Sequence, residues 1–383
     1  MGWRPGRGRT IIVNMASVSG YMTQCVAVSV TAWGLASACG EDEAAPVDLS
    51  CGGQAAYANP GPFPVGVTTL TLNDVSVEVW YPASEAGEAF DAYDLRDWIA
   101  EDLRQMIPDA DAPTFETRSF RNAPVRAGAH PLVVFSHGLG GFRSQSTFFT
   151  THLASWGFVV ASPDHPERGL ALLFTPSTPV FDVAPMTLLQ TLERMRSENG
   201  DEASPFYERI DLEKVAAAGH SAGGSAASVA AMDPIIDTWI GHAGGRTQQI
   251  DKPALIISGA ADGIVTAAEL RGTFDEMSGA NQRYLSIFGA GHLAFSDICL
   301  IAQEDGGLVP FARRYGIEIP VLFESLAVDG CEADDLPAMR AWPVINHYST
   351  AHLFEVFDLA GPAGFTDEAA QCFDPLVLDF EAR

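Results

Sequence analysis

The feature that most constrains the fold is a tight turn between a strand pattern and a helix pattern. The run KVAAA (214–218) leads directly into GHSAG (219–223), and glycine and alanine are frequent in the residues that follow. A strand that turns this sharply into a helix holds the central serine at strained backbone angles with its hydroxyl exposed, and small neighbours let the helix cross the strand closely. The pattern predicts that Ser221 is a nucleophile at a helix N-terminus. The alternative is a glycine-rich packing turn in which the serine is incidental.

Short apolar runs alternate with helical patterns from about residue 63 onward. Strands are predicted at 68–71, 75–80, 131–136, 158–162, 214–218, 254–258 and 284–288, and helices at 93–106, 146–155, 186–195, 267–277 and 348–356. Strands that alternate with helices favour an α/β fold, in which helices cover both faces of a mostly parallel sheet. Residues 298–342 interrupt the alternation, so we expect an insertion before the final helix.

A serine hydroxyl is a weak nucleophile and needs a base. His292 is the best candidate, because it follows the glycine-rich residues 289–291 directly after a strand, so a loop can bring the imidazole over the sheet edge. His220 adjoins Ser221, but its side chain is expected to point away from the tip of the turn. Four other histidines are expected to pack in the core or to lie at the surface: His137, His165, His242 and His347.

The acid is expected between the nucleophile and the base in chain order. Asp262 lies just past the strand 254–258, so its carboxylate would sit at the carboxyl end of a strand, where it can orient the imidazole and stabilise the imidazolium. An aspartate before a glycine is also common in structural loops and caps, which is the alternative. Asp297 follows His292 and is therefore out of order.

The developing oxyanion needs two aimed N–H donors. One is the backbone N–H of Ala222, the residue after the nucleophile. The other is expected from HGLGG (137–141), the loop after strand 131–136, because its glycines let the backbone approach a substrate carbonyl. Leu139 is the best candidate, and the register leaves Gly140 as the alternative.

Three segments, SHGLGG (136–141), LASWGFVV (153–160) and GHSAGG (219–224), resemble the α/β-hydrolase branch of platelet-activating-factor acetylhydrolases and dienelactone hydrolases. They are also similar to cutinase-type polyester hydrolases. VEVWYP (77–82) resembles the first hairpin of the family, and HLAFSD (292–297) resembles its histidine segment. The resemblance covers roughly residues 66–297 and a final helix. It implies an α/β-hydrolase fold with Ser221, Asp262 and His292 as the triad, whereas the insertion is absent from compact cutinases.

Apolar side chains flank the predicted catalytic loops. Leu139, Phe142, Leu293 and Phe295 are expected to line an acyl site, although each could equally be ordinary packing. The insertion is rich in Leu, Val and Phe, so it is either a lid over a lipid-like ester or a helical cap that completes the core.

The charge of the chain limits its partners. The 49 acidic and 22 basic residues give a formal net charge of −27, which disfavours binding to nucleic acids and electrostatic docking on anionic membranes. The sequence contains no CxxC pair, no HExxH and no phosphate-binding GxxxxGK[ST] motif. It therefore predicts neither a metal nor an organic cofactor, and an ester as the small-molecule partner. Its oligomeric state is left open.

The N-terminal residues resemble an export signal. Arg4, Arg7 and Arg9 precede an apolar stretch at 25–38, and LASAC (35–39) resembles a bacterial lipobox, in which Cys39 would be lipidated. Ordinary signal cleavage near Ala38 is the alternative. The acidic, glycine- and proline-rich residues up to 62 suit a flexible tether. We therefore expect a signal peptide at 1–38, a tether at 39–62 and the catalytic domain at 63–383.

Four cysteines beyond the signal and lipidation site would tend to pair in an oxidising compartment, and they allow three pairings. We favour Cys299–Cys331, which brackets the insertion, and Cys51–Cys372, which joins the two ends of the domain.

Together these features predict an exported, lipid-anchored serine hydrolase that cleaves carboxylic esters through an acyl-enzyme. An acyltransferase with the same triad is the alternative within this chemistry. The alternative from another class is a non-catalytic surface lipoprotein that retains the fold for binding.

Overall fold

The computed structural model describes residues 53–174, 183–246 and 251–383. These residues belong to one unit of the chain, Asp48–Arg383. The predicted signal peptide, Cys39 and Cys51 lie outside the described residues. Ala55 and Tyr57 are fully buried, and the backbone N–H of Tyr57 donates to Nδ1 of His347 at 3.2 Å. The tether predicted for 39–62 is therefore too long, because its last residues pack into the domain.

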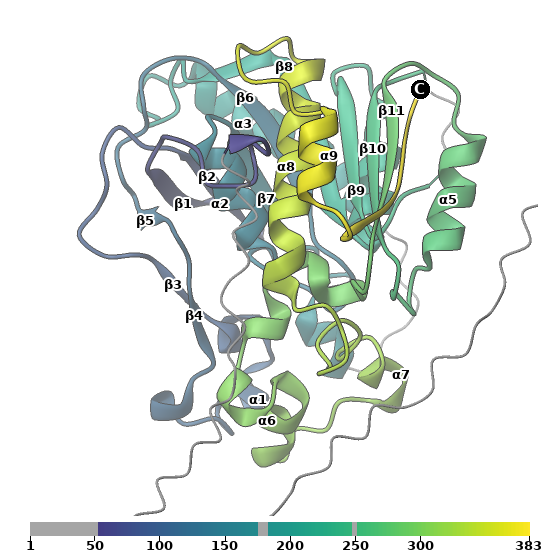
Figure 1. Ribbon diagram of the computed structural model, residues 1–383. Helices are drawn as coiled ribbons and strands as arrows, with labels where there is room; N and C mark the ends of the chain where they lie inside the picture. The colour runs from purple at the N-terminus through teal and green to yellow at the C-terminus, as the bar shows by residue number, and fades with distance from the viewer. Residues whose placement is uncertain (1–52, 175–182, 247–250) are drawn as a thin grey trace, which may run out of the picture. The chain divides into compact units, whose positions relative to one another are not determined.

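A ten-stranded sheet forms the centre of the domain (Figure 1), with the order β12-β11-β10-β9-β8-β6-β7-β2-β1-β5. The six strands β7, β6, β8, β9, β10 and β11, taken in their order across the sheet, are parallel to one another. By contrast, β2 and β12 are antiparallel to their neighbours. The predicted α/β architecture is confirmed. The strand bounds are β1 (Val65–Leu72), β2 (Val75–Pro82), β5 (Phe120–Arg121), β6 (His130–Ser136), β7 (Val159–Pro163), β8 (Ile210–His220), β9 (Thr238–His242), β10 (Ala254–Gly259), β11 (Gln282–Ile287) and β12 (Val377–Ala382).

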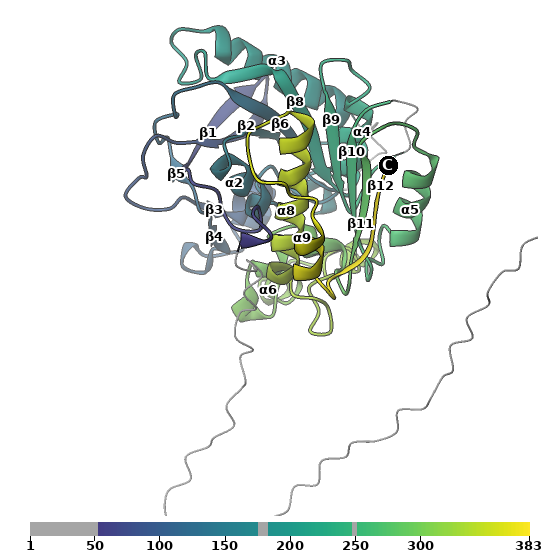
Figure 2. The ribbon, with the colours of Figure 1, turned by 45° about the horizontal axis from the view of Figure 1, so that its top comes forward.

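Helices cover both faces of the sheet (Figure 2). One face packs against α2 (Thr147–Ser155) and α8 (Ala338–Val356), and the other packs against α3 (Ala184–Gly200), α4 (Ala222–Ala230) and α5 (Ala267–Glu276). Side chains alternate along each strand, so Val133 and Phe135 of β6 face the first layer while Leu132 and Val134 face the second. Burial on both faces explains why these strands are continuous apolar runs. A short helix, α9 (Asp367–Cys372), precedes β12.

The predicted helix at 93–106 is wrong. The segment instead forms β3 (Ala92–Asp94), a 3-10 helix (Leu95–Trp98) and the four-residue α1 (Glu101–Arg104), while β3 pairs with β4 (Thr114–Glu116). The carboxylate of Asp94 accepts from the backbone N–H and the guanidinium of Arg96, and that guanidinium also donates to the Ile107 carbonyl. Such local side-chain bonds favour a turn over a continuous helix.

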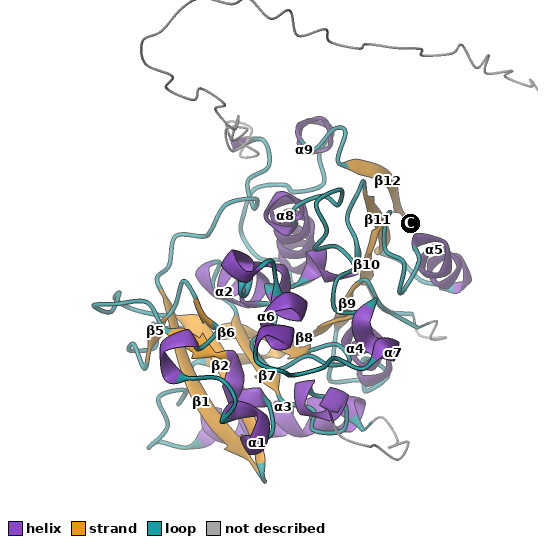
Figure 3. Cartoon of the chain, turned by 90° about the horizontal axis from the view of Figure 1, so that it is seen from below, coloured by secondary structure: helices purple, strands orange, loops and turns teal. Residues whose placement is uncertain are grey.

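Other differences lie at the ends of elements. No strand was predicted at β9 or at β12. Helix α8 begins ten residues before the predicted 348, and Pro343 lies within the part of the helix that was not predicted. A proline inside a helix removes a backbone hydrogen bond, so its presence argued against helix at that point. The insertion therefore ends before α8, and it contains α6 (Leu308–Arg314) and α7 (Val321–Glu324). Both lie in front of the sheet when the domain is seen from below (Figure 3).

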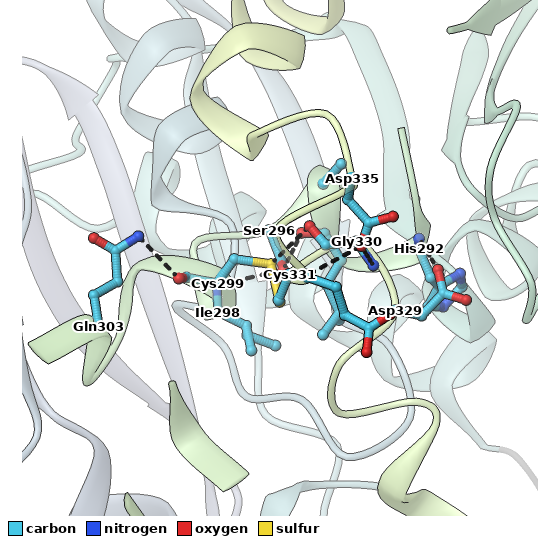
Figure 4. The surroundings of a disulfide bond; sticks show 12 residues. His292, Ser296, Ile298, Cys299, Gln303, Asp329, Gly330, Cys331 and Asp335 are labelled. Atoms are coloured by element: carbon cyan, nitrogen blue, oxygen red, sulfur yellow. Dashed lines mark hydrogen bonds between the residues drawn. A yellow bond between two sulfur atoms is a disulfide. The ribbon is translucent and has the colours of Figure 1, made fainter. Parts of the chain in front are cut away.

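A disulfide joins Cys299 to Cys331, as predicted, and closes the insertion at its base (Figure 4). Cys372 is also disulfide-bonded. Its predicted partner, Cys51, lies outside the described residues, so that pairing stays a prediction. Among the helices that the structure describes, none has the length and apolar character needed to cross a bilayer.

Candidate active site

The turn between β8 and α4 has the geometry that the sequence predicts. Ser221 lies between the two elements with φ 57° and ψ −122°, outside the ordinary regions for a residue with a side chain. Its neighbours must be small: a Cβ on Gly223 would lie 1.9 Å from the carbonyl oxygen of Ser136, and one on Gly244 would lie 2.0 Å from the carbonyl oxygen of Ser221. The glycines therefore permit the strained turn that presents the serine.

Ser221, His292 and Asp262 form one line of hydrogen bonds. Oγ of Ser221 lies 2.9 Å from Nε2 of His292, and Nδ1 of His292 lies 2.8 Å from Oδ2 of Asp262. The other carboxylate oxygen accepts the backbone N–H groups of Ile264 and Val265, each at 2.8 Å. The carboxylate is thus fixed by its own loop, and the imidazole is buried between acid and serine.

The hydrogen bonds of the loop after β6 distinguish between the two candidate oxyanion donors, Leu139 and Gly140. The N–H of Gly138 donates to Oε1 of Gln145, that of Gly140 donates to the carbonyl of Arg168, and that of Gly141 donates to the carbonyl of Gly138. Within the described residues, the N–H of Leu139 has no hydrogen-bond partner. The choice between Leu139 and Gly140 therefore favours Leu139.

The second donor is at the start of α4. The N–H of Ala222 is in the first turn of a helix, where backbone donors have no partner within the helix. In the part of the chain that the structure describes, this N–H donates to no acceptor. Ala222 and Leu139 thus offer two free donors beside the serine.

Gln145 supports this arrangement, and no sequence motif pointed to it. Its Nε2 lies 2.9 Å from Nδ1 of His220, whose Nε2 lies 3.0 Å from the carbonyl oxygen of His292. A neutral His220 that accepts at Nδ1 and donates at Nε2 satisfies both contacts. Burial and the neighbouring His292 lower the pKa of His220 well below its usual value, which keeps it neutral. His220 therefore supports the backbone of His292 through this hydrogen bond, and the structure shows no hydrogen bond between its ring and Ser221.

The remaining histidines are buried and bonded within the core. Burial lowers the pKa values of His137 and His242 to about 3. Nε2 of His165 lies 2.7 Å from Oγ of Ser136, at the end of β6. His152, which the sequence analysis did not weigh, is buried on α2. None of these four lies in the line of hydrogen bonds described above.

Asp297 has a different task from Asp262. Its carboxylate accepts the backbone N–H groups of Thr147 and Phe148 and the Thr147 hydroxyl, so it caps the N-terminus of α2. Burial raises its pKa to about 7. Because its carboxylate is bonded to α2, Asp297 makes no hydrogen bond to the imidazole of His292. This agrees with the expectation that the acid precedes the histidine in the chain.

An apolar cavity of about 100 Å³ adjoins the oxyanion loop. Leu139, Phe142 and Leu293 line it, as the sequence predicts. Phe295 is a correction: it does not line this cavity but is fully buried, with its ring stacked 6.3 Å from that of His220 and 6.0 Å from that of His242. The 3-10 turn His292–Phe295 directs it into the core.

Three further segments outside the central sheet line the cavity, and one of them is the 3-10 helix Leu170–Phe174 after β7, which contributes Leu170, Leu173 and Phe174. The insertion contributes Leu308, Phe311, Phe323 and Leu326, and the segment before β4 contributes Leu95, Ile99, Leu103 and Ile107. Phe311 and Ile317 of the insertion also pack on Ile107. The insertion therefore lines the cavity and completes a small core, as expected of a helical cap, and its role as a lid over a lipid-like ester stays a prediction. Among the described residues that line the cavity, Arg96 alone is charged, and Asp94 and Asp109 neutralise it.

Comparison with solved structures shows the type of fold. A ferulic acid esterase from Streptomyces cinnamoneus superposes with a TM-score of 0.57 and 20% identity, over 82% of this chain and 97% of that chain. This chain has the α/β-hydrolase fold. Family models described as PET hydrolase-like and as platelet-activating factor acetylhydrolase, isoform II match residues 123–301 and 68–175, which confirms the predicted resemblance.

Curated relatives of this α/β-hydrolase match over a short region. Platelet-activating factor acetylhydrolases from Cavia porcellus and Canis lupus familiaris are 34% and 32% identical over 93 and 110 residues, which is 24% and 28% of this chain. These matches span 18% and 24% of the relatives' own length. All three triad positions lie within the PET hydrolase-like match, whereas nearly all of the insertion lies beyond residue 301 and outside both matched ranges.

Proposed function

We propose that this α/β-hydrolase is an exported enzyme that cleaves carboxylic esters with an apolar acyl group. The observation that carries the proposal is the hydrogen-bonded line of Ser221, His292 and Asp262 next to two free backbone donors. This arrangement provides a nucleophile, a base, an orienting acid and an oxyanion site, which acyl transfer from an ester requires. An intact arrangement of this kind argues against a purely binding protein.

The reaction follows from these positions. Oγ of Ser221 attacks the ester carbonyl while its proton passes to Nε2 of His292, and the N–H groups of Leu139 and Ala222 stabilise the oxyanion. The imidazolium then donates that proton to the departing alkoxide, and the acyl group stays on the serine. A water molecule next attacks the acyl-enzyme and gives its proton to His292. Collapse of the second oxyanion returns the proton to Oγ and releases the carboxylic acid.

Water is the proposed acceptor of the acyl group. The relatives and the structural neighbour are known as hydrolases and as an esterase, which supports hydrolysis over transfer to a second alcohol. Incubation of an ester with the enzyme and an added alcohol, followed by product analysis, distinguishes the two. Free acid as the main product supports hydrolysis, and a new ester as the main product would make the protein an acyltransferase.

The acyl group is proposed to enter the apolar cavity beside Leu139. Ala327 of the insertion lines this cavity, so an Ala327→Phe change should shorten it. A few excluded methylenes are worth on the order of tenfold in kcat/KM. We therefore expect kcat/KM of Ala327→Phe to fall by about that factor with p-nitrophenyl octanoate, while hydrolysis of the acetate ester is unchanged.

Ala333→Phe is the control, because Ala333 lies exposed in the same insertion and does not line the cavity. Equal chain-length profiles for all three proteins would contradict this acyl site.

Export and anchoring rest on the N-terminal sequence, with Cys39 as the residue that would be lipidated. The Cys299–Cys331 disulfide supports an oxidising compartment. The protein is expected to partition into detergent and to carry acyl mass on its mature N-terminal peptide, and Cys39→Ala should release it or stall its processing. The peptide is identified by mass spectrometry. A soluble wild-type protein with an unmodified N-terminus would refute the anchor and leave the esterase proposal standing.

A further inference from the structure

The insertion contacts both loops that carry the acid and the base. Oδ1 of Asp329 accepts the backbone N–H of His292 at 2.5 Å, and Oδ2 accepts the backbone N–H of Gly263, the residue after Asp262, at 3.0 Å. The backbone carbonyl of Asp329 also accepts the N–H of Leu293 at 2.8 Å. One carboxylate thus bridges the two loops, and Figure 4 shows it beside His292.

Several features of the insertion bring Asp329 to this place. Gly330 has φ 93°, and a Cβ on Gly291 would lie 2.5 Å from the Cα of Gly330, so the two loops meet through glycine backbones. The carboxylate of Asp335 accepts the N–H groups of Gly330 and Glu332, each at 3.0 Å. These contacts fix the backbone on the C-terminal side of Asp329.

The disulfide fixes the same segment covalently. Cys331, two residues after Asp329, is bonded to Cys299, which lies seven residues beyond His292. The segment therefore cannot move far from the base loop while the bond is intact. Figure 4 shows Asp329 close to Cys331 and to His292.

We propose that Asp329 is a positioning residue. It fixes the position of the Asp262 loop relative to the His292 loop, and the Cys299–Cys331 disulfide in turn restrains Asp329. The proposal rests on the proposed esterase function. The imidazole must keep two hydrogen bonds at once, and a shift of about 1 Å in such a group can cost on the order of 100-fold in rate. Asp329 does not line the apolar cavity, so its effect should fall on the chemical step and not on substrate binding.

The first test replaces the bridging carboxylate. Asp329→Ala is expected to lower kcat by about 10- to 100-fold with little change in KM, and to slow fluorophosphonate labelling of Ser221 by a similar factor. Asp329→Asn should fall between wild type and Asp329→Ala, because an amide offers one acceptor for two N–H groups. Asp334→Asn is the control, since Asp334 is exposed in the same loop and has the same charge. Rates are compared at equal folded concentration, judged by near-UV circular dichroism.

The second test removes the covalent restraint. A Cys299→Ser/Cys331→Ser variant should lose kcat in the same direction, by a smaller factor, because the hydrogen bonds of Asp329 remain possible. The double variant is preferable to a chemical reductant because Cys372 is also disulfide-bonded. Wild-type kcat in Asp329→Ala, or an equal loss in Asp334→Asn, would overturn the positioning role.

Amide hydrogen exchange separates this proposal from the proposed function. In Asp329→Ala, peptides that cover residues 261–265 and 290–295 should exchange faster than in wild type, and the same peptides of Asp334→Asn should not. Faster exchange in a protein whose wild type hydrolyses no ester would sink the esterase proposal and leave the bridging role. Unchanged exchange in Asp329→Ala would sink the bridging role, whatever the esterase activity.

Discussion

A Ser221→Ala variant should fold and lose essentially all esterase activity, with kcat lower on the order of 10⁶-fold. The substitution removes the oxygen that lies 2.9 Å from Nε2 of His292, and in the described part of the chain no other hydroxyl shares that hydrogen bond. Alanine keeps the Cβ that the turn already accommodates, so the backbone between β8 and α4 should persist. The measurement is hydrolysis of p-nitrophenyl esters of increasing acyl length, together with fluorophosphonate labelling followed by intact mass and peptide mapping.

Ser225→Ala serves as the matched control for this prediction. Ser225 lies one turn further along α4 and is partly buried, but it makes no contact with the imidazole of His292. Its variant should label and hydrolyse like wild type. An adduct on a serine other than Ser221, or folded wild-type protein that takes no label, would remove the assignment of the nucleophile.

The second large effect is expected from Asp262→Asn, which should lower kcat on the order of 10⁴-fold. One side-chain oxygen can still accept the N–H groups of Ile264 and Val265, so the loop should keep its shape. The amide NH₂ would then face Nδ1 of His292, which favours the tautomer with its proton on Nε2. That tautomer cannot accept the serine proton. The variant should therefore fold and react slowly with the probe, and it should hydrolyse almost no ester.

Asp297→Asn is the comparison that tests which carboxylate is the acid. Asp297 caps α2 and makes no hydrogen bond to the imidazole. An amide replaces one of its two acceptor oxygens with NH₂, so the variant should lose about 1 kcal/mol in free energy of unfolding and keep kcat near wild type at equal folded concentration. If Asp297→Asn is the inactive variant and Asp262→Asn keeps most of its rate, the acid has been assigned to the wrong loop.

Local sequence was enough to predict the parts of the site that depend on chain geometry. Gly219 and Gly223 are required wherever a strand turns this sharply into a helix, so the position of Ser221 follows from five consecutive residues. The order of Asp262 and His292 along the chain follows from the order of strands in a parallel sheet, since each side chain comes directly after its strand. The strands predicted at 68–71 and 75–80 correspond to β1 and β2, which pair as a hairpin with Asn73 at φ 53° in the turn, because this pairing too depends on neighbouring residues.

Residues that act across long separations in the chain could be found only in the folded protein. Periodicity suggested a helix at 93–106, but Arg96 bonds to Asp94, Ile107 and Asp109 and holds the segment as a wall of the cavity. Phe295 looked like a substrate contact by its place beside His292, yet a 3-10 turn directs it into the core.

The bridge made by Asp329 is the clearest case of what only the tertiary structure decided. Asp329 contacts His292 and Gly263, which lie 37 and 66 positions away in the chain. The sequence around Asp329 has no repeating pattern from which either contact could be predicted. The sequence by itself determined which residues the proposed chemistry uses, because a serine on a strained turn and the chain order of the acid and base candidates are local features. The tertiary structure decided what encloses the site and what holds its loops together, because those contacts depend on where the insertion folds back onto the sheet.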